Sequence, residues 1–381
     1  MGCEDVRGGL AAFAAFACLA GCSPDAAEVA GSDAAPAPSH RGFVATDFTF
    51  EQPASAPNAC PQGFNLDERE HYLAGLTAAE RAAAVDLPQG LDYLRMMRAR
   101  GRPDPCDEPK AFEDLGHLVL DGPGVAAGFD LDGVTSTREN SGPEACPHED
   151  FSSASGAPGF DNALWRVLGC IRGYQRGSTI DEYAIENIKS GARTILIEIT
   201  DLDDLRDDDD VGLGIYSSSD LLPAAADGRP LSGGSLSVTE ALRFHNTARG
   251  VLKDGVLSAG PIDLRLDFKG QFLESELHLR DARVRLELTP DGGLRGLIGG
   301  YWAIEEFYDV YARQATTAGA YTVGFRCPAL HSALVRAADR SPDAETGACT
   351  AVSTAFRIEA IPAFVVQPPP STNTQASTEA F

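Results

Sequence analysis

The chain has 381 residues and carries 31 Lys and Arg against 56 Asp and Glu, a formal net charge of −25. A surface this acidic repels the phosphate backbone of DNA and RNA, which excludes nucleic acid as an expected partner. Divalent cations are favoured instead, because they are the natural counterions of crowded carboxylates.

The first 21 residues have the features of an export signal. Leu10 to Gly21 is a run of 12 apolar or small residues, shorter than the ~20 that a membrane-spanning helix needs. The run ends in Leu19-Ala20-Gly21-Cys22, which resembles the lipobox of bacterial lipoproteins. The resemblance implies that residues 1–21 are removed as a signal peptide and that the Cys22 thiol carries a lipid such as palmitate. Ser23 after the cysteine resembles lipoproteins of the outer membrane. A buried alanine-rich helix is the alternative for this run.

The number of cysteines supports export. Of the nine, two leave with the signal peptide and Cys22 takes the lipid. The remaining even set predicts three disulfides in an oxidising compartment. Its members are Cys60, Cys106, Cys146, Cys170, Cys327 and Cys349. We expect neighbours to pair, as Cys60–Cys106, Cys146–Cys170 and Cys327–Cys349. Reduced, buried thiols would instead indicate a cytosolic protein.

Two ends of the mature chain lack the apolar residues that a core needs. Residues 22–45 are expected to form a flexible tether and residues 367–381 a disordered tail. Residues 46–120 are expected to be partly helical. Thr77 and Glu80 form a capping box that opens a helix to about Val85. A second helix is predicted over Leu91–Arg100, before Gly101 and Pro103.

Residues 121–366 are expected to form a mainly β domain. From residue 193 the apolar period becomes two, which predicts strands over 194–199, 211–216, 262–268 and 294–302. The alternation changes parity between Leu279 and Val284, which predicts a bulge at Arg280-Asp281. Short helices are expected at 303–314 and 328–338, and one or two closing strands within 352–366. Short connections favour antiparallel pairing. We therefore expect an antiparallel β-sandwich or open barrel with short helical insertions and a small helical N-terminal region.

A polar loop in this domain holds the candidate metal ligands. Carboxylate and amide oxygens are what calcium prefers, and the loop is rich in Ser, Gly and Pro, so a metal and a disulfide would help to order it. The candidate calcium ligands are Asp130, Asp132, Asp150, Asp161 and Asn162. The alternative is that these side chains cap turns and face water. His148 near Cys146 is only weak support for zinc. The aspartates between 201 and 210 form a second cluster, either a solvated loop or a weak calcium site.

The same loop offers an enzymatic alternative. Phe129-Asp130-Leu131-Asp132-Gly133-Val134 resembles the first motif of haloacid dehalogenase-type phosphatases. The resemblance implies a magnesium-dependent phosphatase in which Asp130 is the nucleophile and Asp132 the general acid. The second motif would be Ile195–Thr200, and Lys253 or Lys269 would supply the third. The glycine-rich segment before the motif and the polar loop after it differ from the family's buried parallel strand and helix.

The function that we expect rests on the predicted location of the protein and not on a recognised binding or catalytic site. The sequence predicts a lipid-anchored protein of the cell envelope, in the outer membrane, stabilised by calcium and disulfides. We expect it to be non-enzymatic, with no catalytic residue assigned, and to bind an envelope protein, a polysaccharide or another external ligand. The phosphatase stays open as the alternative.

Overall fold

The computed structural model describes residues 39–52, 60–83, 104–121, 124–270, 273–314 and 323–369. These residues form the mainly β, antiparallel fold that the sequence predicts. The strands are β1 (Ser39–Phe50), β2 (Thr194–Leu202), β3 (Asp208–Ser218), β4 (Gly234–Ser237), β5 (His245–Lys253), β6 (Val256–Gly270), β7 (Leu273–Leu288), β8 (Leu294–Ala303), β9 (Arg340–Pro342) and β10 (Cys349–Val366). Cys22 and the predicted helix over Leu91–Arg100 lie outside the described residues.

Short helical segments accompany the strands. They are α1 (Glu68–Ala74), α2 (Ala78–Ala83), η2 (Pro109–Ala111), α4 (Ala163–Leu168), η3 (Arg172–Tyr174), α5 (Thr179–Lys189), η4 (Leu242–Phe244), α6 (Ile304–Tyr308), η5 (Asp309–Gln314) and α7 (Cys327–Ala337). The capping box is confirmed, since the Thr77 amide and hydroxyl donate to Glu80 and the Glu80 amide donates to Thr77. Within the described parts of the chain, every helix is too short or too polar to cross a bilayer.

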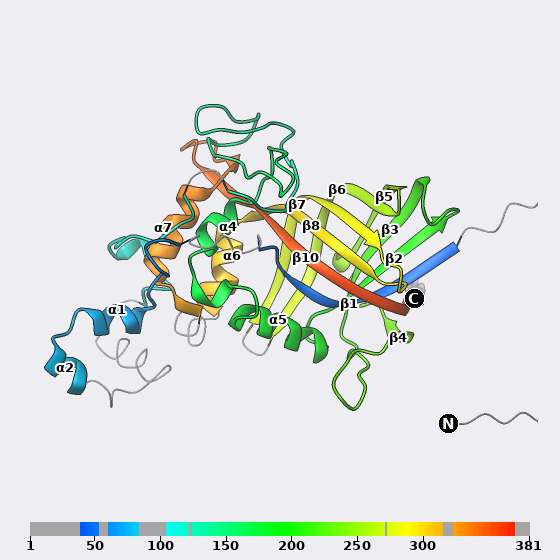
Figure 1. Cartoon of the computed structure of the whole chain (residues 1–381), viewed down its shortest axis with the longest axis horizontal. Helices are drawn as coiled ribbons and strands as arrows, with labels where there is room; N and C mark the ends of the chain where they lie inside the picture. Colours follow the sequence, from blue (N-terminus) through cyan, green and yellow to red (C-terminus); the bar gives the residue numbers. More distant parts are fainter. Residues whose placement is uncertain are drawn as a thin grey trace, which may run out of the picture. The chain divides into compact units, whose positions relative to one another are not determined.

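The ten-stranded sheet closes on itself. Its path runs β1-β2-β3-β5-β6-β7-β8-β10, and β10 also pairs with β1 in antiparallel register, for example Phe48 opposite Ile358. This last pairing joins the two ends of the path into a closed barrel (Figure 1). β4 pairs in parallel with the final residues of β10, and β9 pairs with its first residues.

The bulge that reconciles the two apolar parities of β7 is confirmed. The register of β7 against β8 shifts between Arg280 and Arg283, and Asp281 has a positive φ of 52°. Leu279 and Val284 are therefore both buried, although they differ in parity. A straight strand would have turned one of them toward solvent.

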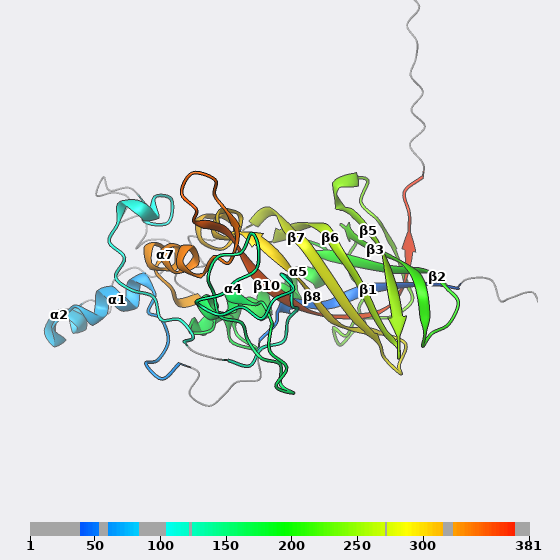
Figure 2. The same ribbon diagram turned by 90° about the horizontal axis from the view of Figure 1, so that it is seen from above.

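Aromatic side chains fill one end of the barrel. Trp302 of β8 is fully buried, and its ring contacts Phe307 of α6 at a centroid distance of 5.3 Å and Phe356 of β10 at 6.1 Å. Tyr311 of η5 stacks on Phe307 at 4.9 Å. α6 and η5 therefore close the barrel at the end where β10 begins (Figures 1 and 2).

β1 begins earlier than expected. The tether was expected to reach residue 45, but the strand starts at Ser39. Phe43 and Val44 pair with both β2 and β10, and both side chains are buried. Burial between two strands therefore draws residues 39–45 into the barrel, which leaves the tether prediction for residues 22–38 outside the described residues.

The disulfides are present, but the neighbour pairing is wrong. The bonds are Cys60–Cys170, Cys106–Cys327 and Cys146–Cys349, spanning 110, 221 and 203 residues of sequence. Each bond ties a segment that precedes β2 to a part of the chain that lies far along the sequence. Long-range packing, rather than sequence distance, decides which thiols meet.

Candidate functional site

The acidic loop (residues 124–162) packs against the outer wall of the barrel beside the start of β10. Phe129 lies on Gly299 of β8, where a side chain in place of the glycine hydrogen would come within 2.7 Å of the ring. Leu131 packs with Tyr301 of β8 and Ala351 of β10. The Cys146–Cys349 bond fixes the same loop to the first residue of β10. Two apolar anchors and one covalent bond thus position the polar side chains between them.

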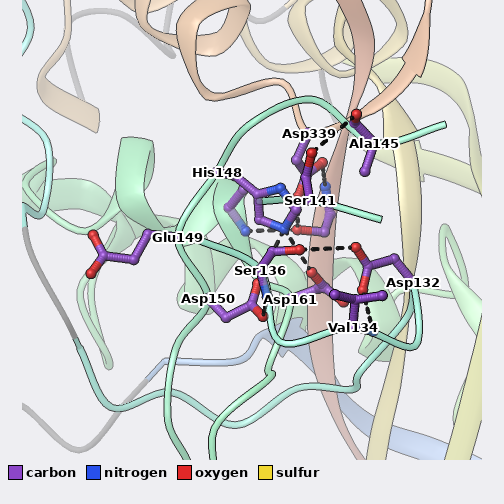
Figure 3. A network of polar contacts seen from close by, with 12 residues as sticks. Asp132, Val134, Ser136, Ser141, Ala145, His148, Glu149, Asp150, Asp161 and Asp339 are labelled. Carbon is purple, nitrogen blue, oxygen red and sulfur yellow. Dashed lines mark hydrogen bonds and ion pairs between the residues drawn. The ribbon is translucent and has the colours of Figure 1, made fainter. Parts of the chain in front are cut away.

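His148 lies at the centre of a group of carboxylates (Figure 3). Its Nδ1 is 2.7 Å from the carbonyl oxygen of Cys146, so this nitrogen donates to the backbone. Its Nε2 lies 3.1 Å from Oδ1 of Asp150 and 3.2 Å from Oδ1 of Asp161. Asp132 joins His148 and Asp161 in a set whose ligand atoms lie within 4.8 Å of one another.

The two closest carboxylates are oriented in the same way. Oδ2 of Asp150 accepts the Ser136 amide at 2.5 Å, and Oδ2 of Asp161 accepts the Leu131 amide at 2.6 Å. Each residue therefore uses one oxygen to hold the backbone and presents the other to His148. Their side chains are only 3% and 1% exposed, so this presentation takes place away from bulk water.

Asp132 closes the group from the other side. Its Oδ1 accepts the Val134 amide at 2.9 Å and its Oδ2 accepts the Ser136 hydroxyl at 3.1 Å. Gly142 packs against this carboxylate so closely that a Cβ there would lie 2.9 Å from Oδ2. The glycine gives the carboxylate the space it occupies.

The imidazole is strongly favoured in its charged form. Burial alone would lower the pKa of His148, but the carboxylates of Asp150 and Asp161 outweigh it and raise the pKa to about 11. Burial raises the pKa of Asp161, helped by the charges of Asp150 and Asp132. Burial also raises the pKa of Asp339, to about 7. The group therefore holds more acidic side chains than one imidazolium neutralises.

Asp339 links this group to the barrel. One of its oxygens accepts the Ser353 amide of β10 at 2.8 Å, and the other accepts the Ser353 hydroxyl. The Ser353 hydroxyl in turn accepts the Ala163 amide at 2.8 Å, at the start of α4. Because Asp339 and Ser353 are both buried, these bonds hold the loop, α4 and β10 in one arrangement.

The structure separates the sequence-predicted ligands into two sets. Asp132, Asp150 and Asp161 come together, whereas Asp130 is exposed and accepts the Gly133 amide at 2.7 Å. Asn162 stands at the start of α4, and its amide lies 3.4 Å from the Ala127 carbonyl. His148 was not among the predicted ligands, although it lies at the centre of the group. Its place between Cys146 and Asp150 was the available signal.

The structural context that the phosphatase alternative requires is not found. In the described chain, Phe129 forms an isolated antiparallel bridge with Asp161 rather than ending a buried parallel strand. β2, which contains the expected second motif, pairs antiparallel with both of its neighbours. The order of strands and crossover helices that the family needs is therefore different from this barrel.

A second polar group lies on the outer wall of β2, β3 and β5. Glu198 is only 9% exposed there, and it binds His40 at 2.8 Å, the Tyr216 hydroxyl at 3.2 Å and the Gln367 amide at 3.0 Å. It borders an open cleft of about 440 Å³ that also contains Gly212, Gly214 and Arg249. Glu198 has a complete set of hydrogen-bond donors, so this group holds the C-terminal segment against the barrel.

The aspartates between 201 and 210 form an exposed hairpin between β2 and β3. Asp204 and Asp208 accept backbone amides of the same turn. Asp201 and Asp210 each lie 2.6 Å from the guanidinium of Arg249. Local amides and an arginine thus balance part of this charge.

No protein-family model matches the chain, and neither a curated protein nor a solved structure is significantly similar to it.

Proposed function

We propose that this chain is an exported, lipid-anchored protein of the cell envelope, in which the acidic loop binds a divalent cation and presents a binding surface for an envelope component or an external ligand. This proposal rests on the position of the acidic loop relative to Ser39, where the chain enters the barrel. The loop adjoins Cys349 and Ala351 at the beginning of β10. Pro362, near the end of the same strand, pairs with Phe43 close to the start of β1.

The distance between these two places is large for a single strand. Ala351 and Pro362 belong to one continuous strand, and at about 3.3 Å per residue they lie roughly 35 Å apart. A lipid on Cys22 would reach the barrel through the chain that enters at Ser39. The acidic loop lies at the opposite end of β10 from that entry point, which would leave it accessible to an envelope protein or a polysaccharide.

The disulfides support an exported location. Three bonds connect sequence-distant segments of this chain, and such bonds persist in oxidising compartments rather than in the cytosol. The Cys146–Cys349 bond also stabilises the acidic loop, which holds several carboxylates in close proximity, because a covalent constraint reduces the entropy of the unfolded chain.

Lipid attachment is tested by metabolic labelling with a palmitate analogue in a bacterial host. We expect the full-length chain to be labelled, to fractionate with membranes and to have Cys22 as its mature N-terminus. Cys22→Ser removes the lipid-accepting thiol and should abolish the label. Cys18→Ser is the matched control, because it removes a thiol that leaves with the signal peptide. An unlabelled protein that retains Met1 would refute the proposed anchor.

A further inference from the structure

We infer that His148, Asp132, Asp150 and Asp161 form a binding site for a divalent transition-metal ion of the zinc class. This inference deepens the cation binding of the proposed function and rests on it only for the role of the acidic loop, since it needs no lipid anchor. The inference is based on the orientation of the His148 ring. Nδ1 donates to the Cys146 carbonyl, which leaves Nε2 as the nitrogen that faces Asp150 and Asp161.

A fixed Nδ1–H and a directed Nε2 is the arrangement that metal-binding histidines adopt. The hydrogen bond to a backbone carbonyl selects the tautomer and orients the ring, so that the other nitrogen can coordinate the ion. In His148 the carbonyl comes from Cys146, which the bond to Cys349 holds in place. The orienting group is therefore itself fixed to the barrel.

An unsatisfied buried oxygen points independently to a missing ligand. Asp150 Oδ1 is buried and receives no hydrogen bond from any described residue. It lies 3.1 Å from Nε2 of His148, but the single hydrogen on that nitrogen is directed at Asp161 Oδ1. A buried carboxylate oxygen without a donor is destabilising by roughly 1–3 kcal/mol. A cation that takes the place of the Nε2 hydrogen would give this oxygen a partner.

The distances between the ligand atoms suit a small ion. Zinc binds imidazole nitrogen and carboxylate oxygen at about 2.0–2.2 Å, and neighbouring ligands of a tetrahedral ion at that distance are about 3.3 Å apart. The Nε2 to Oδ1 distances here are 3.1 Å for Asp150 and 3.2 Å for Asp161. Asp132 belongs with His148 and Asp161 to the set whose ligand atoms lie within 4.8 Å of one another, and it supplies the next carboxylate; Asp150 lies outside that set and contacts it through Nε2 of His148.

The donor set distinguishes between metal classes. Calcium is bound by six to eight oxygen atoms in flexible loops, whereas imidazole nitrogen suits zinc, copper, iron and nickel. One nitrogen and three carboxylates, each held by a backbone amide, form a small and rigid set. The site therefore favours a zinc-class ion over the calcium that the sequence predicts.

The test is metal titration of the purified full-length chain after treatment with a chelator, using Zn²⁺, Mn²⁺ and Ca²⁺ separately in a calorimeter. We expect one Zn²⁺ per chain, Mn²⁺ weaker than Zn²⁺, and Ca²⁺ weaker by at least about 100-fold. Binding of Co²⁺ provides a second readout, because a four-coordinate Co²⁺ ion in a closed site gives visible absorption bands that are much more intense, and at longer wavelength, than those of hydrated Co²⁺.

The variants separate the site from the general acidity of the surface. His148→Ala and Asp161→Asn should each weaken Zn²⁺ binding by about 100-fold or more, because each removes a direct ligand. Glu149→Gln is the matched control, because it lies next to both ligands in sequence but its side chain points away from the group (Figure 3). Asp130→Asn is the second control, since it removes the expected calcium ligand that lies outside the group. Both should bind Zn²⁺ like the unchanged chain.

Three results would overturn the inference. The first is tighter binding of Ca²⁺ than of Zn²⁺, and the second is unchanged Zn²⁺ affinity in a folded His148→Ala variant. The third is a loss of Zn²⁺ binding in Asp130→Asn while Asp161→Asn binds Zn²⁺ like the unchanged chain. If His148→Ala fails to fold, as judged by circular dichroism, the Co²⁺ spectrum of the unchanged chain decides the matter. Absence of the bands then refutes coordination by His148. Palmitate labelling is unaffected by any of these outcomes, so failure of the metal site and failure of the anchor are distinguishable.

Discussion

Cys146 both orients the His148 ring and links the acidic loop to the barrel. The carbonyl oxygen of Cys146 accepts a hydrogen bond of 2.7 Å from Nδ1 of His148, while its sulfur is bonded to Cys349. The bridge that attaches the acidic loop to the barrel therefore also orients the imidazole. Stability of the loop and geometry of the metal site should change together when this bond is removed.

The Cys146→Ser/Cys349→Ser double variant tests this coupling. We expect the free energy of unfolding to fall by about 2–5 kcal/mol, because the unfolded chain gains freedom. Zn²⁺ affinity should fall by about 10–100-fold, because the residue that orients His148 is no longer held. Urea unfolding and calorimetry measure the two effects. The Cys60→Ser/Cys170→Ser variant should be destabilised with unchanged affinity, and equal affinities in both variants would contradict the coupling.

His117 should make the protein less stable in mild acid. Burial lowers its pKa from 6.5 to about 4 in the folded protein. Below pH 6.5 the unfolded chain takes up a proton that the folded protein refuses until about pH 4. The free energy of unfolding therefore falls as the pH is lowered through this window, by at most about 1.4 kcal/mol per pH unit.

The His117→Gln variant isolates this effect from other titrating groups. The glutamine side chain cannot be protonated in this range. As the pH is lowered from 6.5 to 4, the unchanged chain should therefore lose more unfolding free energy than the variant does. Denaturant unfolding at a series of pH values measures that difference. A difference that is constant with pH, or that grows in the opposite direction, would show that His117 is readily protonated in the fold.

Trp302 should be a main contributor to the core at the closed end of the barrel. The side chain is fully buried, with Phe268, Phe307, Tyr311 and Phe356 around it. Trp302→Ala should reduce the free energy of unfolding by about 3–5 kcal/mol, because it removes buried apolar surface and leaves a cavity. Far-ultraviolet circular dichroism in urea measures it.

Phe364→Ala is the matched control for Trp302. This side chain is 66% exposed near the end of β10, so its removal should change the free energy of unfolding by no more than about 0.5 kcal/mol. A larger loss at Phe364 than at Trp302 would place the stabilising core elsewhere.

Tyr216 should ionise only in strong alkali. Burial, together with the charge of Glu198 and its hydrogen bond, raises the pKa of Tyr216 to about 12. Glu198→Gln removes the charge but keeps the shape, so the pKa of Tyr216 should fall toward 10 while burial keeps it above that value. The ultraviolet absorbance of the phenolate follows the titration. Tyr216→Phe identifies which part of the curve belongs to this residue, and an unchanged curve in Glu198→Gln would contradict the proposed contact.

Local signals predicted the local features. The capping box at Thr77 and the bulge after Arg280 each follow from a few neighbouring residues, and both are found. Strand patterns also predicted β2, β3, β6 and β8, of which β6 shows the alternation of a strand with one buried face. Closure between β1 and β10 has no local signal, since the paired residues lie more than 300 positions apart.

The ligand group was predicted only in part. Asp132, Asp150 and Asp161 were expected as ligands, but the same composition also suggested Asp130 and Asn162. In the structure, Asp130 turns to the Gly133 amide three residues on, a local bond that competes with any distant partner. Residue type alone does not distinguish a carboxylate that caps a turn from one that faces a histidine.

By itself, the sequence determined the antiparallel mainly β character, the positions of most strands and the presence of three disulfides, because these depend on alternation, turn residues and cysteine number. Only the tertiary structure decided which cysteines pair, how the barrel closes and that His148 lies among three carboxylates. Those outcomes depend on contacts between segments that are 110 to 221 residues apart for the disulfides. Contacts of that range form only when the whole chain packs around one core, so no local pattern encodes them.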